Sequence, residues 1–357
     1  AFEPDIPRLS AWVPVQWEHG RKAVYRRNPY YWKIDTAGNQ LPYADELVFT
    51  VIPNSELVLL KFMAGEIDLH ELSNYTKSLD FLRQEQSNGV YELHFSTPTP
   101  SLVLYLNWDA PRPAVREAFR KRNVRIALSQ ALNREEISHV IFGGLLEPSG
   151  FSYSRASPYY SRDGSMLYAQ YDPAEAAVLL DQERYFDSDE DGFREFPDGS
   201  RFELTIDAFS GSYIPDLSEL IAGQWEVLGI KVHLNVGLQE ILLPKRINGD
   251  FEIHITSAPI DPLTQAHHFG IMGPNLPFWH RDADTDGPDW LNEVTHGIRQ
   301  AQTVIDPEKL GPQMEHLHHL VSTNIPFIAL GALTGPWGAN QRLGNVPDLL
   351  SFQHRVD

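Results

Sequence analysis

The sequence predicts an α/β protein, because strands and helices alternate in its second half, and its length and composition suit a globular protein of two domains. Between Asp172 and Thr256, short apolar segments alternate with segments whose apolar residues recur every three or four positions. Strands that alternate with helices in this way form a sheet with right-handed crossovers. The chain has 357 residues, enough for two domains with a core each, and its 42% of hydrophobic residues is ordinary for a globular protein.

Composition and charge exclude several classes of function. The net charge of -19 disfavours nucleic acid and anionic membranes as partners. Cysteine is absent, which excludes disulfides, thiolate metal sites and a cysteine nucleophile. No apolar run approaches the roughly 20 residues that span a bilayer. The start, AFEPDIPRLS, does not resemble a signal peptide, so we expect either a mature chain or a piece of a longer one.

The first part of the chain predicts paired strands and one short helix. Alternation from Trp12 to Trp32 indicates two strands that turn at Gly20. Proline ends a strand over Glu46–Pro53, and a helix over Ser55–Ala64 ends at Gly65. The further strands that we expect in this part cover residues 66–69, 90–96 and 101–107.

The stretch from Val115 to Pro148 predicts two consecutive helices. Apolar residues at helical spacing define one face of the first: Val124, Ala127, Leu128, Ala131 and Leu132. Asn133 can cap the second helix, Glu136 can complete a capping box, and Gly143-Gly144 ends it. The basic residues Arg120-Lys121-Arg122 indicate a solvated helix face.

The second half carries the alternation that defines the fold class. Asp172-Pro173-Ala174-Glu175 predicts a helix start, with an acidic cap followed by proline. The elements expected next are strand 202–208, helix 213–228, strand 230–236, helix 238–246 and strand 251–256. Residues 257–288 form a long irregular stretch of the kind that is usually functional or disordered. Helices over 290–304 and 306–322 and a strand over 325–333 complete the chain.

Several segments together resemble one known family. "VREAFRKRNVRIALSQALNREEI" resembles its "VRQALSxAINREEI" segment, and "RNPYYWKIDTAGNQLPYADELVFTVIPN" and "LLKFMAGEIDL" resemble its "NPdYW…PYlDeIvF" and "aLlsGEIDi". The closing "QRLGNVP" is similar to one branch of the family. The chain is thereby identified as a member of family 5 of the extracellular solute-binding proteins, the oligopeptide and dipeptide type of receptors of ABC importers.

The resemblance implies a two-lobed, type II periplasmic-binding-protein-like fold. Hinge strands near 104–108 and 326–330 would join the lobes. Residues 1–108 would form part of lobe I, residues 109–325 lobe II, and residues 326–357 the return to lobe I. Members of the family are longer than this chain, so we expect a C-terminal fragment that lacks the N-terminal strands and a small extra domain.

The implied function is capture of an extracellular solute in the cleft between the lobes, for delivery to the membrane subunits of an ABC permease. Lobe closure would bind the solute without a covalent step, so no enzyme is expected and no cofactor is required. The location would be periplasmic or extracellular, with the full-length precursor associated with the membrane. The solute is either an oligopeptide or an oligosaccharide.

Residues near the hinge strands and in the long loop are the candidate ligand contacts. Aromatic side chains could stack on sugar rings or peptide side chains, although each alone is more often packing. The candidates are Tyr105, Asn107, Trp108, Ser257, Asp261, His267, Trp279 and Trp337. Where peptide-binding members carry an aspartate for the peptide's amino terminus, this chain has Ala258. A buried ammonium without a carboxylate is costly, so a free peptide amino terminus is in doubt and sugar stays open beside peptide.

Two further patterns suggest metal or catalysis. Asp187, Asp189 and Asp191, followed by Gly192, match the start of a calcium loop, and Asp198 falls at its twelfth position. The alternative is an acidic solvated turn. A hydrolase or metal-dependent enzyme using the His-rich loop at 267–268 is the alternative function, but the HExxH, GxSxG and SxxK patterns are absent. His316 and His319 share a helix face, which more often is simply solvated.

Overall fold

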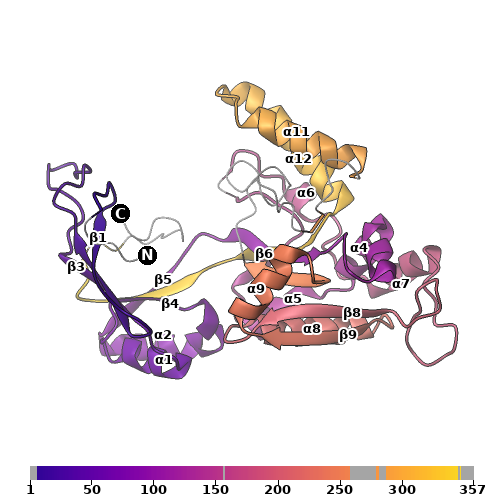
Figure 1. Ribbon diagram of the computed structural model, residues 1–357, viewed down its shortest axis with the longest axis horizontal. Helices are drawn as coiled ribbons and strands as arrows, with labels where there is room; N and C mark the ends of the chain where they lie inside the picture. The colour runs from indigo at the N-terminus through magenta and orange to yellow at the C-terminus, as the bar shows by residue number, and fades with distance from the viewer. Residues whose placement is uncertain (1–5, 156, 258–278, 281–286, 345, 347–357) are drawn as a thin grey trace. The chain divides into compact units, whose positions relative to one another are not determined.

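The computed structural model describes residues 6–155, 157–257, 279–280, 287–344 and 346. The chain divides into two compact units. Unit 1 comprises Ala1–Leu72, Phe81–Thr97 and Pro336–Asp357, and unit 2 comprises Ser73–Asp80 and Pro98–Gly335. Both are drawn in Figure 1, and each is described here by itself.

Unit 1 contains two antiparallel three-stranded sheets. The first has the order β1-β2-β3, formed by β1 (Trp12–Glu18), β2 (Lys22–Arg27) and β3 (Glu46–Thr50). The second has the order β4-β12-β5, formed by β4 (Leu69–Glu71), β12 (Pro336–Asn340) and β5 (Tyr91–Phe95). Its central strand therefore comes from the far end of the sequence. The predicted pairing around Gly20 is confirmed.

Short helices connect these strands. They are α1 (Ser55–Met63), the 3-10 helix η1 (Ser73–Ser78), α2 (Leu79–Glu85) and the 3-10 helix η2 (Gln86–Asn88). The strand expected over 66–69 is wrong, because β4 begins only at Leu69. The amides of Gly65 and Glu66 still bond the last carbonyls of α1, so the helix end occupies the place given to the strand.

A six-stranded sheet forms the centre of unit 2, in the order β7-β11-β6-β10-β8-β9. Its strands are β6 (Thr99–Leu106), β7 (Leu146–Pro148), β8 (Glu203–Phe209), β9 (Lys231–Gly237), β10 (Ile253–Ser257) and β11 (Ile328–Leu333). The predicted alternation is confirmed for β8, β9 and β10, which run parallel. Strand β6 runs antiparallel to both of its neighbours, so the sheet is mixed.

The helices that the structure describes in unit 2 after β6 are α3 (Pro113–Arg120), α4 (Arg122–Gln130), α5 (Arg134–Phe142), α6 (Arg162–Ser165), α7 (Pro173–Gln182), α8 (Ile214–Glu226), α9 (Gln239–Asn248), α11 (Asp289–Ala301) and α12 (Pro307–Asn324). Helices α5, α8 and α9 contact this sheet, and further helices pack against one another to extend a large apolar core. In Figure 1, α8 lies along β8 and β9, and α11 lies beside α12. The fully buried Trp225 of α8 donates its indole N–H to the carbonyl of Leu128 in α4, 2.9 Å away.

The turn between α4 and α5 differs from the predicted capping box. Asn133 does cap α5, since its side chain accepts from the Glu136 amide at 3.1 Å. The reciprocal bond is absent, because the side chain of Gln224 from α8 stands in its place. The Gln224 amide accepts from the Asn133 backbone N–H at 3.0 Å and donates to the Glu136 carboxylate at 2.8 Å.

The boundaries between the units lie elsewhere than the lobe boundaries expected from the sequence. The expected divisions after residues 108 and 325 differ from the observed crossings at Thr97/Pro98 and Gly335/Pro336. The reason is that β6 and β11 are neighbouring strands inside the sheet of unit 2, so the segments proposed as hinges belong to its interior. In addition, residues 73–80 belong to unit 2, where the Thr76 hydroxyl donates to the Ile141 carbonyl at 2.7 Å.

Across the described residues, no helix combines the length and apolarity that crossing a membrane requires.

Candidate ligand-binding site

Trp108 and Trp279 meet just beyond the end of β6. The backbone N–H of Trp108 donates to the Trp279 carbonyl at 2.7 Å, and the two indole rings lie 5.2 Å apart, edge to face. Their exposed fractions are 3% and 0%. Two candidates that are far apart in the sequence are thus brought together by the fold, in unit 2.

Asn107, the neighbouring candidate, is engaged entirely by the protein. Its side-chain amide donates to the carbonyls of Gly249 and Phe251 and its oxygen accepts from the Asp109 amide. These bonds tie the end of β6 to the turn before β10. These hydrogen bonds support a structural role for the Asn107 side chain.

Tyr105 is buried in the middle of the sheet, in a row of polar side chains. Its register partner on β10 is His254, which in turn pairs with Asp207 on β8, and Asp207 pairs with Asn235 on β9. Burial raises the pKa of Tyr105, and it lowers the pKa of His254 to about 3, aided by the positive charge of Arg246. Burial also raises the pKa of Asp207, although a hydrogen bond of 2.6 Å from Asn235 opposes that effect.

The remaining candidates do not join this group within the described residues. Trp337 lies on β12 in unit 1, 4% exposed and stacked on His94 with a centroid distance of 4.6 Å. The backbone of Ser257 pairs with Leu102 at the end of β10. Asp261 and His267 fall outside the described residues. Ligand contact by each of these residues stays a prediction.

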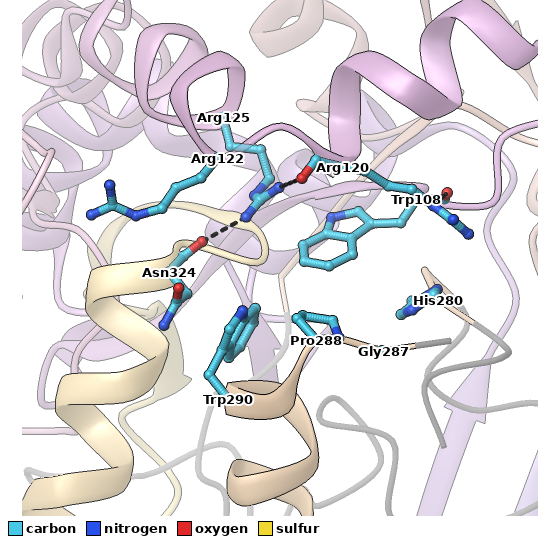
Figure 2. Close-up of a pocket in the computed structure, with 9 residues that line it drawn as sticks. All are labelled: Trp108, Arg120, Arg122, Arg125, His280, Gly287, Pro288, Trp290 and Asn324. Atoms are coloured by element: carbon cyan, nitrogen blue, oxygen red, sulfur yellow. Dashed lines mark hydrogen bonds between the residues drawn. The ribbon is translucent and has the colours of Figure 1, made fainter. Parts of the chain in front are cut away.

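A pocket of about 310 Å³ opens beside Trp108, and sequence reasoning found only part of its lining. Figure 2 shows the lining residues, which are Trp108, Arg120, Arg122, Arg125, His280, Gly287, Pro288, Trp290 and Asn324. They come from the end of β6, from α3 and α4, and from the start of α11 and the end of α12. The sequence signal is the basic run Arg120-Lys121-Arg122, which predicts a solvated helix face and does not include Arg125.

Arg125 forms one wall of this pocket and is 2% exposed. Its guanidinium lies 4.3 Å from the ring centre of Trp108. It donates to the backbone carbonyls of Ile325, Phe119, Arg120 and Asn324, at distances from 2.7 to 2.9 Å. None of these partners is a carboxylate, and burial lowers the pKa of Arg125 to about 9. Among the described residues, this buried positive charge is therefore stabilised by neutral carbonyls and by the Trp108 ring.

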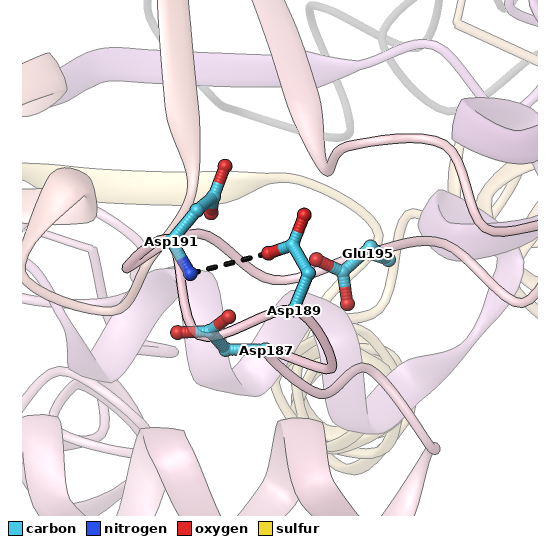
Figure 3. A group of neighbouring side chains, drawn as sticks. All are labelled: Asp187, Asp189, Asp191 and Glu195. Atoms are coloured by element: carbon cyan, nitrogen blue, oxygen red, sulfur yellow. Dashed lines mark hydrogen bonds between the residues drawn. The ribbon is translucent and has the colours of Figure 1, made fainter.

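The acidic turn forms a cluster that differs in one member from the predicted calcium ligands. The carboxylates of Asp187, Asp189, Asp191 and Glu195 offer oxygen atoms within 4.8 Å of one another (Figure 3). Glu195 thus takes the fourth place given to Asp198, whose carboxylate instead accepts from the amide and hydroxyl of Ser200. The cluster also accepts bonds from its own backbone, as from Gly192 to Asp187, and Asp191 pairs with Arg201. Four carboxylates suit the oxygen preference of calcium.

Comparison with known proteins decides the family. The model of bacterial extracellular solute-binding proteins, family 5 Middle, matches residues 9–270. The chain belongs to this family. The structure is thus that of a family 5 solute-binding protein, and the fold of solved periplasmic binding proteins extends over almost all of it.

Relatives of this family 5 protein include receptors for sugars and for peptides. The periplasmic alpha-galactoside-binding protein of Rhizobium meliloti is 28% identical, over 96% of this chain and 52% of its own length. The oligopeptide-binding protein AppA of Bacillus subtilis is 21% identical, over 88% of this chain and 54% of its own length. The chain spans about half the length of the curated relatives that it matches.

Solved structures that resemble the chain likewise include one with a bound sugar and one named for oligopeptide binding. The periplasmic binding protein MelB of Agrobacterium fabrum, in complex with stachyose, superposes with a TM-score of 0.82 at 25% identity, covering 96% of this chain and 54% of MelB. The oligopeptide-binding protein OppA superposes with a TM-score of 0.67 at 26% identity, covering 98% of this chain and 60% of OppA.

Proposed function

We propose that this family 5 protein captures an extracellular oligosaccharide as the substrate-binding component of an ABC importer. Binding would proceed by non-covalent contacts alone, with no chemical step. The predicted position of the solute between two lobes stays a prediction.

One observation carries the choice of sugar. At nearly equal sequence identity, the stachyose-bound MelB superposes with a TM-score of 0.82 and OppA with 0.67. The alpha-galactoside-binding protein, 28% identical, points in the same direction over 96% of the chain.

The sequence adds an argument against peptides with a free amino terminus. The resemblance places Ala258 where peptide-binding members have an aspartate. An ammonium that is taken out of water without a partner carboxylate loses several kcal/mol of hydration. An uncharged oligosaccharide has no such requirement.

We further propose a periplasmic or extracellular location and delivery to ABC permease membrane subunits. The names of the alpha-galactoside-binding relative and of MelB both describe them as periplasmic. The proposed full-length precursor is associated with the membrane.

Calcium is a second proposal, for a structural site at the acidic turn. The group Asp187, Asp189, Asp191 and Glu195 supports it, because an ion would relieve the repulsion of carboxylates held within 4.8 Å of one another. Such an ion would stabilise the turn rather than take part in solute capture.

Thermal unfolding against panels of ligands tests both proposals. A ligand that binds only the folded state, present at 100 times its Kd, adds about 2.7 kcal/mol to the free energy of unfolding. We expect alpha-galactosides such as stachyose to raise Tm and a panel of oligopeptides to leave it unchanged. A shift with peptides alone would make the protein an oligopeptide receptor, and no shift with either class would contradict solute capture by this chain.

The calcium arm of the same series has its own control. We expect Ca²⁺ to raise Tm of the wild-type chain, EDTA to reverse the rise, and Asp189→Asn to abolish it. Asp198→Asn is the matched control, since that carboxylate lies outside the cluster. An equal rise in both variants would show nonspecific screening.

A further inference from the structure

The pocket beside Trp108 lies at the end of the sheet of unit 2 that is remote from the crossings at Thr97/Pro98 and Gly335/Pro336. The chain enters unit 2 at Pro98 and reaches Trp108 along β6, roughly 33 Å of extended strand. Strand β11 runs in the opposite direction to β6. Its start, near the pocket residue Asn324, therefore lies at the pocket end of the sheet, and the chain leaves unit 2 at Gly335, after the strand. The pocket therefore lies far along the sheet from these two crossings.

The side chains that line the pocket are rich in positive charge and in hydrogen-bond donors. They include three arginines, one histidine and two tryptophans, and no carboxylate belongs to the described lining. The nearby carboxylate of Asp109 is paired with Arg120 at 2.7 Å and with His280 at 3.2 Å. In a chain of net charge -19, this is a local concentration of cations.

Helix α4 begins at the pocket with its first turn uncapped. No side chain caps it, no acidic residue lies in its first turn, and its first residue, Arg122, lines the pocket. Exposed N–H groups at a helix start carry partial positive charge and favour anions.

Two buried polar atoms of the lining lack a hydrogen-bond partner among the described residues. They are the indole Nε1 of Trp108 and Nε2 of His280, whose residues are 3% and 1% exposed. Buried polar groups are almost always satisfied by protein, water or ligand. This observation is independent of the helix start, and it also points to a bound group.

Aromatic walls define the shape of the ligand. Trp290 lies 6.1 Å from Trp108, edge to face. In Figure 2, Pro288 lies below Trp108 and beside Trp290, and Arg125 lies above Trp108. This corner suits a flat apolar group, and about 310 Å³ is near the lower end for small-molecule pockets.

We propose that this pocket binds a small organic carboxylate with a flat apolar body. The carboxylate lies beside Arg125 and the start of α4, and the flat group packs against the two indoles. The Arg122 guanidinium donates to the Thr323 carbonyl and bonds the Tyr168 hydroxyl, so Arg122 contributes through its positive charge at the helix start. The inference does not depend on the proposed sugar capture.

Tryptophan fluorescence and Tm of the full chain, titrated with benzoate, test the proposal. We expect benzoate to change the emission saturably and to raise Tm. The neutral isostere benzamide lacks the charge, and inorganic phosphate lacks the flat group, so each is expected to bind at least tenfold more weakly. Equal effects of benzamide, or binding of phosphate alone, would overturn the proposal.

Matched variants locate the effect. We expect Arg122→Gln and Trp290→Leu each to weaken benzoate at least fivefold. Arg299→Gln removes the same charge on an exposed residue of α11, roughly 14 Å along the helix from Trp290, and is expected to bind benzoate as the wild type does. Circular dichroism establishes that each variant is folded. Equal affinity in Arg122→Gln and Arg299→Gln would overturn the assignment.

One further variant distinguishes a ligand from the chain's own carboxylates. The sequence before Gly287 contains Asp282, Asp284 and Asp286. If benzoate binds only after these three are changed to asparagine, the pocket serves the chain's own acidic side chains and the proposal is wrong. A stachyose shift that Arg122→Gln leaves intact, beside a lost benzoate response, separates this site from the proposed function.

Discussion

Buried Arg134 ties helix α5 to the sheet of unit 2 without a carboxylate partner among the described residues. Arg134, 2% exposed, donates to the carbonyls of Ala329, Ser129 and Ala169 and to the Ser129 hydroxyl. It thereby joins α5 to β11 and to the segment before α7. Burial lowers the pKa of Arg134 to about 9, because the charged guanidinium loses its hydration inside the protein.

His254 makes the stability of unit 2 sensitive to acid. It is 1% exposed, lies 5.2 Å from the ring of Phe209, and bonds Arg246 through Nε2 at 3.0 Å. Its pKa is about 3 in the folded state, against an ordinary value of 6.5. Between these values the unfolded chain binds a proton that the folded chain does not, so stability falls as pH drops below 6.5.

We expect His254→Phe to flatten this dependence. From pH 7 to pH 5 the free energy of unfolding of the wild-type chain should fall by about 2 kcal/mol more than that of the variant, because residue 254 no longer titrates in the variant. Urea unfolding at a series of pH values measures it. His139→Gln is the control, since that histidine is exposed on α5. The assignment fails if both variants retain the wild-type slope.

At the scale of elements, the pairing of β11 with β7 depends on a glycine. Gly331 has φ of 154°, and a Cβ there would lie 2.2 Å from the backbone oxygen of Glu147. The register of β11 against β6 also shifts on both sides of this residue. Close approach of the two backbones leaves no room for a side chain.

Two Gly→Ala substitutions are expected to act in opposite directions. Gly331→Ala should lower the free energy of unfolding by about 3 kcal/mol, because β7 must move. Gly223→Ala, inside α8 where a Cβ meets nothing within 4 Å, should raise it by about 0.5 to 1 kcal/mol through helix propensity. Urea denaturation compares them, and a stable Gly331→Ala would contradict the close approach of β7.

At the scale of the whole molecule, the two units differ in how continuous they are. All six strands of the large sheet lie within residues 98–335. The second sheet of unit 1 instead takes its central strand β12 from Pro336–Asn340, far from β4 and β5. A break in the chain at Thr97/Pro98 or at Gly335/Pro336 therefore affects the two units unequally.

We expect a fragment of residues 98–335 to unfold cooperatively in urea, because it contains the whole six-stranded sheet and its core. Near-UV circular dichroism of the fragment follows the transition. Loss of residues 73–80 removes the Thr76 bond to Ile141 and the ion pair of Lys77 with Asp216, so some stability is lost. The comparison fragment, residues 1–97, lacks β12 and is expected to unfold at lower urea. A noncooperative transition of 98–335 would show that unit 2 needs unit 1.

Local chemistry in the sequence determined most helices, several caps and the family. Asp172 caps α7 and Asn133 caps α5 as predicted, because a cap depends on residues three positions apart. The alternation over β8, α8 and β9 likewise depends on short-range periodicity. The family resemblance used contiguous segments of the same kind, and the match over residues 9–270 confirms it.

Only the tertiary structure decided which distant residues meet. The antiparallel place of β6, the Gln224 amide inserted at the cap of α5, and Glu195 in place of Asp198 each depend on how the chain folds back. The pocket beside Trp108 joins residues as far apart in the sequence as Trp108 and Asn324. Sequence periodicity predicts which face of a helix or strand is apolar. The contacts of a buried arginine depend instead on which backbone carbonyls of other helices and strands lie beside it in the folded chain.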